Sequence, residues 1–271
     1  ISDTKVVAIG GGTGLSTMLK GLKLHTHNIT AVVTVADDGG SSGILRSDLG
    51  MLAPGDVRNC VSALAEVDPV MGELLNFRFK DGSLKGHSLG NLFLAALNET
   101  SSSFDEAVKK FSHLAGVVGT VYPVTNESVT LSALLEDGRL IEGESHIGVH
   151  HDGPKNGIVK LMVNPEKPKA VDGVIKALEK ADIIVLGPGS LYTSIIPNLL
   201  VDGVVDAIKK SNAVKIYVCN IMSQAGETEN YTVSDHLAAI ERHSYEGIAD
   251  IVIANNAIIP ESLRIKYASE H

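Results

Sequence analysis

The chain has 271 residues and a formal net charge of −9, from 23 Lys and Arg against 32 Asp and Glu, and it contains no Trp. This acidic balance excludes a broad nucleic-acid-binding surface, which needs a cationic stripe for the phosphate backbone. Hydrophobic residues make up 44% and charged residues 20%, which is ordinary globular usage and excludes a disordered or fibrous protein. Cys60 and Cys219 are the only cysteines, too few for a disulfide framework or a cysteine-based zinc site, and this fits a reducing cytosol.

The apolar runs of the sequence are short. Residues 183–186 and 214–219 have strand length, and no run approaches the roughly 18 residues of a membrane-spanning helix. The opening residues, 1–5, lack the basic and apolar stretches of a secretory signal. We therefore expect a cytoplasmic protein with no membrane span.

A strand, a glycine loop and a helix open the chain. Residues 5–9 are apolar and run into a glycine-rich loop at 10–14, and apolar residues then recur with helical spacing up to residue 22. Residues 29–35 are rich in β-branched side chains without alternation, which is typical of a strand buried on both faces of a parallel sheet. This second strand ends in an acidic loop rich in glycine and serine, at 37–43.

Three helices are predicted next. The first covers residues 57–67 and the second covers 92–97, and each follows a loop that contains glycine. The third begins at Ser103, where the side chains of Ser103 and Glu106 form a capping box for the opening backbone N–H groups, and it continues to about residue 114.

The middle of the chain differs from both ends. Residues 129–135 and 140–143 flank a turn at 136–139 that contains Asp-Gly, a strong hairpin signal. Strands without helices are predicted between about residues 120 and 165. This segment indicates an antiparallel β insertion or extension of a sheet.

Alternation of helices and strands returns after this segment. Helices are predicted at 170–180, 199–210 and 234–243, and strands at 182–186, 215–219 and 250–254. Because right-handed crossovers make such strands parallel, the loops that follow them meet at one edge of the sheet. The chain is therefore predicted to be one α/β domain, residues 1–271, with a Rossmann-like, doubly wound and mainly parallel sheet and a β-rich segment at about 120–165.

The loop formed by Gly10, Gly11, Gly12, Thr13 and Gly14 lies between a strand and a helix. Glycine lets the backbone approach a phosphate, and the helix N-terminus supplies free N–H groups. The loop lacks the third small residue of the dinucleotide fingerprint and the Lys of a Walker loop. It predicts an anion-binding site, and a purely structural turn stays open as the alternative.

A second loop carries two carboxylates at the end of a strand. Asp37 and Asp38 are placed to bind ribose hydroxyls or a hard cation such as Mg²⁺, with Ser41 and Ser42 just after them. The alternative is an exposed polar turn, since Asp, Gly and Ser are ordinary turn residues.

Further polar loops converge on the same predicted edge. The strand at 182–186 runs into a loop rich in glycine and hydroxyl groups, and the strand at 215–219 is followed directly by Asn220. Structural turns alone give no reason for such convergence, so a binding site is favoured. The candidate residues of these loops are Gly187, Gly189, Ser190, Tyr192, Thr193 and Asn220.

A serine hydrolase is a competing interpretation. Residues 39–43 and 86–90 both match G-x-S-x-G, and the second places Ser88 before a helix. A nucleophile elbow needs a strand that runs directly into the serine, and neither stretch has one. This interpretation is therefore disfavoured.

Other polar side chains near the loops carry weaker signals. His146, His150 and His151 are interpreted as surface or packing histidines, because adjacent residues of a strand point to opposite faces. The cations that flank the loops are candidate phosphate partners or, equally, solvated surface charges. They are Arg46, Arg58 and Lys85.

Taken together, these motifs resemble the gluconeogenesis factor family, within the larger superfamily that contains the 2-phospho-L-lactate transferase of deazaflavin cofactor synthesis. The resemblance covers nearly the whole chain. It rests on five stretches: Gly-Gly-Gly-Thr-Gly at 10–14, Asp-Asp-Gly-Gly-Ser-Ser-Gly at 37–43, Pro-Gly-Asp-Val-Arg-Asn at 54–59, Gly-His-Ser-Leu-Gly-Asn-Leu at 86–92 and Gly-Pro-Gly-Ser-Leu-Tyr-Thr-Ser at 187–194.

The resemblance implies a cytoplasmic regulator that binds UDP-sugars such as UDP-N-acetylglucosamine and is needed for cell shape on gluconeogenic carbon sources. The implied protein partner is the synthase that makes glucosamine 6-phosphate. Under this interpretation the glycine loop with Thr13 binds the diphosphate, and Asp37 or Asp38 binds ribose or a cation. Asn220 and residues 190–193 contact the rest of the ligand, and Asn91 also belongs to the ligand-binding residues.

The transferase branch of the superfamily implies a different activity. It would be a Mg²⁺-dependent transfer from a nucleotide-activated substrate, with Asp38 and Asp56 at the metal. The sequence ends at His271, and its length is shorter than the resemblance to the family implies. A further C-terminal segment is therefore expected. A homodimer is the default expectation for the assembly.

Overall fold

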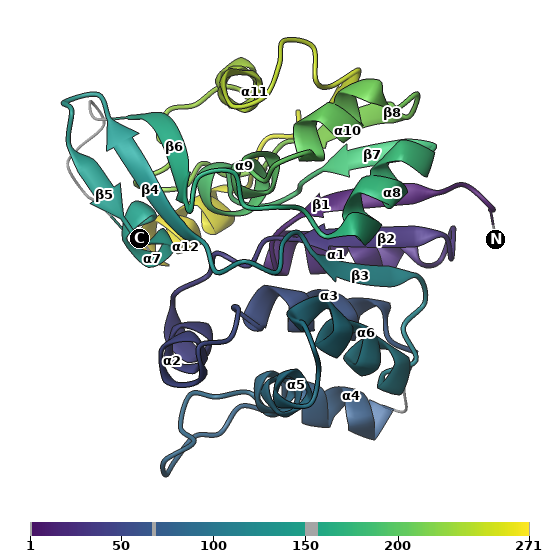
Figure 1. Cartoon of the computed structure of the whole chain (residues 1–271). Helices are drawn as coiled ribbons and strands as arrows, with labels where there is room; N and C mark the ends of the chain where they lie inside the picture. Colours follow the sequence, from purple (N-terminus) through teal and green to yellow (C-terminus); the bar gives the residue numbers. More distant parts are fainter. Residues whose placement is uncertain (1, 67–68, 150–156, 271) are drawn as a thin grey trace.

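The computed structural model describes residues 2–66, 69–149 and 157–270. Its centre is a six-stranded sheet in the order β3-β2-β1-β7-β8-β9, with every neighbouring pair parallel (Figure 1). The strands are β1 (Val6–Gly10), β2 (Ile29–Val33), β3 (Thr120–Pro123), β7 (Ile183–Leu186), β8 (Val214–Val218) and β9 (Ile251–Ile253). The predicted doubly wound, mainly parallel α/β fold is confirmed.

The first strands are the most deeply buried part of the sheet. All five residues of β1 are buried, and so are four of the five residues of β2. β-branched side chains suit this position, because they pack against helices on both faces of a parallel sheet. Every residue in the register from Val6 to Gly10 pairs with β2, so the ends of these strands are fixed relative to each other.

Helices cover both faces of this sheet. One face carries α1 (Thr13–Leu22), α3 (Gly55–Leu64) and α6 (Phe104–Leu114), and the other carries α8 (Asp172–Lys180) and α10 (Val204–Lys210) (Figure 1). The helix α11 (Val233–Arg242) connects β8 to β9. Each of the three sequence-predicted helices between residues 57 and 114 is present.

Two helices of the first half were not expected. The acidic loop was predicted to remain a loop through Gly43, but α2 (Gly40–Leu49) begins inside it. The helix α4 (Pro69–Asn76) precedes α5 (Leu89–Glu99), and both pack in a layer outside α3 (Figure 1). The predicted capping box is half correct, because Ser103 accepts from the N–H of Glu106 whereas Glu106 accepts from the N–H of Ser102.

The middle segment forms a separate antiparallel sheet. Its order is β5-β4-β6, from β4 (Thr130–Leu135), β5 (Leu140–Glu142) and β6 (Ile158–Asn164). The predicted hairpin between β4 and β5 is confirmed. Two features differ from the prediction: β3 belongs to the main sheet, and a short helix, α7 (Glu144–Ile147), follows β5.

The second half departs from the prediction at one helix. The helix predicted at 199–210 is shorter in the structure, where α10 covers Val204–Lys210, and a π-helical turn (Leu191–Ile195) and α9 (Ile196–Leu199), which were not predicted, precede it. The break before α10 lies at Gly203, which has a φ of +86°, a conformation that favours glycine. A last helix, α12 (Glu261–Glu270), was not predicted. Within the described residues, none of the helices is both long enough and apolar enough to cross a membrane.

Candidate functional site

The strand order creates a crevice beside β1. The chain moves from β1 toward β2 and β3 in its first half and toward β7, β8 and β9 in its second half. The loops that follow β1 and β7 therefore diverge, and ligands of such sheets bind outside the carboxyl ends of the strands at this point. A cavity of about 840 Å³ lies there.

The lining of this cavity joins the predicted loops. The contributions come from the loops after β1, β2, β7 and β8, from the start of α3, and from α7. The sequence-predicted residues that line it are Gly11, Gly12, Thr13, Gly14, Asp37, Asp56, Gly189, Ser190, Thr193 and Asn220. Their part in ligand binding remains a prediction, but the structure brings them to one cleft.

The glycine loop is packed too tightly for side chains. A Cβ at Gly11 would lie 2.5 Å from Ser194 Oγ, and a Cβ at Gly14 would lie 2.8 Å from the carbonyl oxygen of Pro188. A Cβ at Gly12 would collide with the Asp56 carboxylate. The glycines thus let the backbone approach the neighbouring loops, and the first turn of α1 points its N–H groups toward the cleft.

Asp56 lies beneath the glycine loop at the start of α3. Burial and the neighbouring Asp37 raise its pKa to about 7, against a smaller lowering by the Gly12 N–H and by Arg58. Burial disfavours the charged carboxylate, and a second negative charge adds to this effect. Asp56 therefore exchanges a proton near neutral pH.

Glu144 adds a third carboxylate to this end of the cleft. It is the first residue of α7, and its side chain is half-buried. Burial raises its pKa to about 8, with further contributions from Asp37, Asp38 and Asp56. One end of the cleft is therefore strongly acidic, and the described residues that line the cleft include no Lys or Arg.

Asp38 points away from this lining. Its Oδ2 accepts the N–H of Glu144 at 2.9 Å, and its Oδ1 accepts the N–H of Ser145 at 2.8 Å. Asp38 is not among the residues that line the cleft. Both of its carboxylate oxygens thus serve α7, whereas the sequence suggested that they bind ribose or a metal ion.

The loops after β7 and β8 are hydrogen-bonded to each other. Asn220 Oδ1 accepts the N–H of Gly189 at 3.2 Å, and Ser190 Oγ accepts from Gln224 Nε2 at 2.8 Å. Thr193 Oγ1 donates to Glu227 Oε1 at 3.2 Å. These contacts fix the wall of the cleft that the loops after β7 and β8 form.

Tyr192 lies in the core rather than in the cleft. It has no exposed surface, and its hydroxyl contacts the carbonyl oxygen of Ile158 at 3.2 Å and Tyr231 Oη at 2.9 Å. The sequence placed Tyr192 in the ligand-binding set because of its position in the loop. The π-helical turn instead directs this side chain toward β6 and α11.

Ser41 and Asn91 belong to a buried polar network behind the acidic loops. Asn91 Nδ2 donates to Ser41 Oγ at 3.1 Å, and Asn91 Oδ1 accepts from Arg58 Nε at 3.1 Å. Ser41 Oγ also lies 2.9 Å from His87 Nδ1, and Arg58 donates to Asn76 Oδ1 at 2.7 Å. The network joins α2, α3 and α5, so these residues support the loops from behind.

The remaining candidates have structural partners. Ser42 Oγ accepts the N–H of Gly55, and Ser88 is the buried N-cap of α5, where it accepts from Asn91 N. Neither Gly10 nor Gly187 lines the cleft. The N-cap geometry of Ser88 removes the basis of the hydrolase interpretation, since no strand delivers this serine to the cleft.

The candidate cations and histidines also lie elsewhere. Arg46 donates to the carbonyl oxygens of Ala36, Asp37 and Val129, and it thereby holds the loop after β2. Lys85 is exposed on the loop between α4 and α5. His146 Nδ1 contacts the carbonyl oxygen of Glu142 at 2.8 Å, and positions 150 and 151 fall outside the described residues.

Comparison with known proteins shows which family the chain belongs to. The model of the family described as 2-phospho-L-lactate transferase CofD matches residues 6–271. The chain belongs to the CofD family. Its relatives include a Thermoanaerobacterium thermosulfurigenes protein, 54% identical over 270 residues, and a Clostridium acetobutylicum protein, 52% identical over 267 residues, both named "Putative gluconeogenesis factor". The gluconeogenesis factor of Bacillus subtilis is 45% identical over 269 residues.

A solved structure shares the fold of this chain. It is that of a Bacillus halodurans protein described as a member of the UPF0052 family, with a TM-score of 0.95 and 46% identity over 100% of this chain and 86% of that chain. The matches to these two curated relatives cover 98% and 100% of this chain. They cover only 59% of the length of the Clostridium acetobutylicum protein and 83% of the length of the Thermoanaerobacterium thermosulfurigenes protein.

Several cleft residues of this CofD-family chain were missed from the sequence. Glu144 and Gln224 line the cleft from segments that carry no recognisable motif. Thr17 was assigned only to a helix, although it follows Thr13 by one helical turn and lines the same cleft. Helical spacing from the glycine loop was the signal that would have found it.

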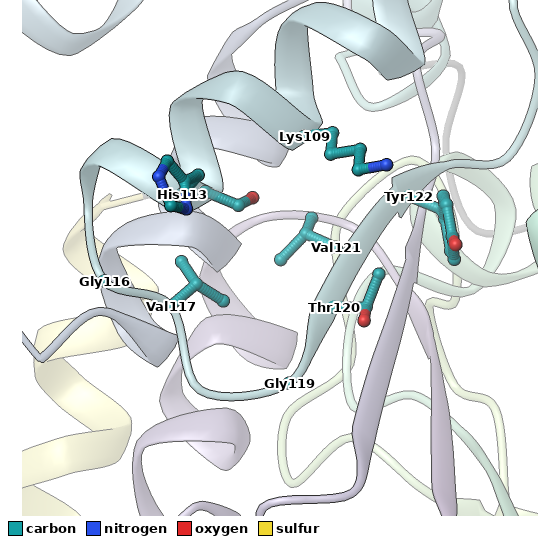
Figure 2. Close-up of a pocket in the computed structure, with 9 residues that line it drawn as sticks. Lys109, His113, Gly116, Val117, Gly119, Thr120, Val121 and Tyr122 are labelled. Atoms are coloured by element: carbon teal, nitrogen blue, oxygen red, sulfur yellow. The ribbon is translucent and has the colours of Figure 1, made fainter.

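A second, smaller cavity lies away from the cleft. It has a volume of about 360 Å³ and lies between α6, which contributes Lys109 and His113, and the edge strand β3, from which Val121 points toward the helix (Figure 2). It shares no lining residue with the cleft at the ends of β1 and β7. No residue of the five predicted motifs lines this smaller cavity.

Proposed function

We propose that this chain binds a nucleotide sugar of the UDP-N-acetylglucosamine type in the cleft between β1 and β7 and acts in the cytoplasm as a regulator. In this role it adjusts carbon flux into cell-envelope precursors and supports cell shape during gluconeogenic growth. The glucosamine 6-phosphate synthase is the proposed protein partner. The names of the relatives support the metabolic setting of this proposal.

The observation that carries the proposal is the polarity of the cleft. The glycine loop and the N-terminus of α1 offer backbone N–H groups, which suit a diphosphate. Asp56 lies directly beneath this loop, and Asp37 and Glu144 line the same cleft, so carboxylates that suit the hydroxyl groups of ribose or of a sugar lie next to the diphosphate position. A nucleotide sugar has both kinds of group within one molecule.

Binding without reaction is supported by the side chains of the cleft. Ser190 Oγ accepts from the amide of Gln224, which is not a base, and no histidine is among the described residues that line the cleft. Thr193 donates to the carboxylate of Glu227, but both of these residues are buried. An activated nucleophile needs an adjacent base. These contacts favour a binding protein, whose output is delivered through a partner.

A second candidate function is a Mg²⁺-dependent transferase, which the three carboxylates of the cleft and the family description favour. Among the described residues, no group of three or more His, Cys, Asp and Glu is arranged to hold a metal ion. A cation held by Asp37 and Asp56 would take its other ligands from water and from the phosphates of the substrate, as Mg²⁺ commonly does. When bound, it would neutralise developing phosphate charge.

Product analysis separates the two candidates. The purified protein is incubated with UDP-N-acetylglucosamine or GDP together with candidate acceptors, with and without Mg²⁺, and the recovered nucleotides are identified by mass spectrometry. The regulator predicts unchanged UDP-N-acetylglucosamine in every sample. Conversion that depends on Mg²⁺, and that is lost in Asp56→Asn, would replace the regulator by the transferase.

A further inference from the structure

The small antiparallel sheet reaches the cleft through α7. This helix begins directly after β5, and Figure 1 shows it at the end of the small sheet, beside the carboxyl ends of the main strands. Its only side chain in the lining of the cleft is Glu144. The position of this carboxylate therefore depends on how α7 is held.

Asp38, in the loop after β2, holds the N-terminal end of α7 by two hydrogen bonds. The N–H groups of Glu144 and Ser145 open the helix and have no partner inside it, and Asp38 accepts both, at 2.9 and 2.8 Å. A carboxylate at this position also interacts favourably with the positive end of the helix. Asp38 and Glu144 are separated by 106 residues in sequence. Their contact joins the loop after β2 of the six-stranded sheet to the helix that follows β5 of the small sheet.

The backbone around α7 is shaped for this contact. Gly143 has a φ of +95°, and a Cβ there would lie 3.0 Å from Asp38 Oδ2. The N–H of Gly143 donates to the carbonyl oxygen of Leu131 at 2.8 Å, and Ile147 is fully buried. The base of α7 is thus fixed to β4 and to the core, while Asp38 fixes its N-terminal end.

We infer that Glu144 contacts the ligand at the acidic end of the cleft, where it accepts from sugar or ribose hydroxyls, and that Asp38 is a positioning residue that acts through Glu144. The inference rests on the proposed function, since the ligand is taken to be a nucleotide sugar. It assigns Asp38 a different role from that of a direct ligand or metal-binding group. It also gives the small sheet a function, which is to complete the binding site.

A double-mutant cycle tests this inference. Affinity for UDP-N-acetylglucosamine is measured for the wild type, Asp38→Ala, Glu144→Ala and the double variant, with circular dichroism to establish folding. Each single change is expected to weaken binding by ~10- to 100-fold, since the hydroxyl groups of the bound ligand are left without their acceptor inside the cleft. If Asp38 acts through Glu144, the double variant binds no more weakly than Glu144→Ala. Losses that multiply would show that Asp38 contacts the ligand or a cation by itself.

Hydrogen exchange provides a test that does not need the ligand. The amides of Glu144 and Ser145 are expected to exchange at least ~10-fold faster in Asp38→Ala than in the wild type. Asp38→Asn keeps one acceptor oxygen and is expected to give an intermediate rate at one of the two amides. Unchanged exchange at both amides in Asp38→Ala would overturn the positioning role. A wild type that binds no nucleotide sugar would overturn the proposed function and the ligand contact of Glu144, whereas the positioning of α7 by Asp38 is tested separately by the exchange result.

Discussion

The Asp56 carboxylate occupies the space in which a side chain at Gly12 would begin. A Cβ at Gly12 would collide with this carboxylate and would lie 2.8 Å from Asn59 Nδ2, and the N–H of Gly12 donates to Asp56. The anion-binding loop and the acidic end of the cleft are therefore one packed unit. A change in either residue is expected to disturb the other.

Gly12→Ala is predicted to lower both stability and ligand affinity. The added methyl group displaces Asp56 and Asn59 from a close-packed site, which typically costs about 1–3 kcal/mol of unfolding free energy. Urea denaturation and calorimetric titration measure the two effects. Gly21→Ala is the matched control, because it lies in the same helix and a Cβ there would meet no atom within 4 Å. It is expected to leave affinity unchanged and to alter stability by no more than about 1 kcal/mol.

Stability is predicted to fall as pH rises through neutrality. Asp56 has a pKa of about 7 against an ordinary 3.8, and Glu144 has a pKa of about 8 against an ordinary 4.5. Between the ordinary and the raised pKa of each group, the folded chain binds more protons than the unfolded chain. Raising the pH through this range therefore lowers the free energy of unfolding. We expect a loss of about 2 kcal/mol or more between pH 5 and pH 8 in the absence of divalent cations.

Asp56→Asn is predicted to reduce this pH dependence and to be more stable than the wild type at pH 8. Denaturant titrations at a series of pH values measure the effect. Asp48→Asn, a change at an exposed carboxylate of α2, serves as the control and should keep the wild-type slope. A slope that is equal in Asp56→Asn and in the wild type would contradict the burial of an ionisable Asp56.

Asn91→Ala is predicted to act on stability more than on binding. The change removes the acceptor of Arg58 Nε and one of the two partners of Ser41 Oγ in a buried network, at a cost of about 1–3 kcal/mol. Asn98→Ala, in the same helix, is expected to stay within about 0.5 kcal/mol of the wild type. A loss of ligand affinity in Asn91→Ala with unchanged stability would instead support the direct contact that the sequence suggested.

Tyr192→Phe is predicted to lower stability by about 1–2 kcal/mol, since its hydroxyl is bonded to Ile158 and Tyr231 inside the core. Burial raises the pKa of this phenol far above its ordinary value, so the side chain stays neutral. Ligand affinity is expected to remain at the wild-type level in the same calorimetric assay. A marked loss of affinity would mean that Tyr192 reaches the cleft.

Local patterns predicted the scaffold well where burial and pattern coincide. The buried β-branched runs of β1 and β2 and the Asp-Gly turn between β4 and β5 were recognisable from the sequence. The start of α2 was not, because Gly-Ser-Ser-Gly has low helix propensity and is held by a buried network with His87 and Asn91. Tertiary contacts decide the structure there.

The candidate site was predicted at the level of loops and less well at the level of side chains. Converging strand ends located the cleft, because parallel topology forces them together. The direction of each side chain depends on contacts from distant segments: Asp38 turns toward α7, and Tyr192 turns toward β6. Glu144 escaped notice because only the packing of the small sheet brings it to the cleft.

Binding of a nucleotide sugar in the cleft beside β1 is tested most directly by calorimetric titration of the metal-free protein with UDP-N-acetylglucosamine and with GDP. Each titration is made with and without Mg²⁺, in the wild type and in Gly12→Ala. We expect saturable binding of UDP-N-acetylglucosamine by the wild type without Mg²⁺, and we expect this binding to be lost in Gly12→Ala. No binding, or equal binding by the wild type and Gly12→Ala, would contradict the proposed binding, and Mg²⁺-dependent preference for GDP would favour the transferase.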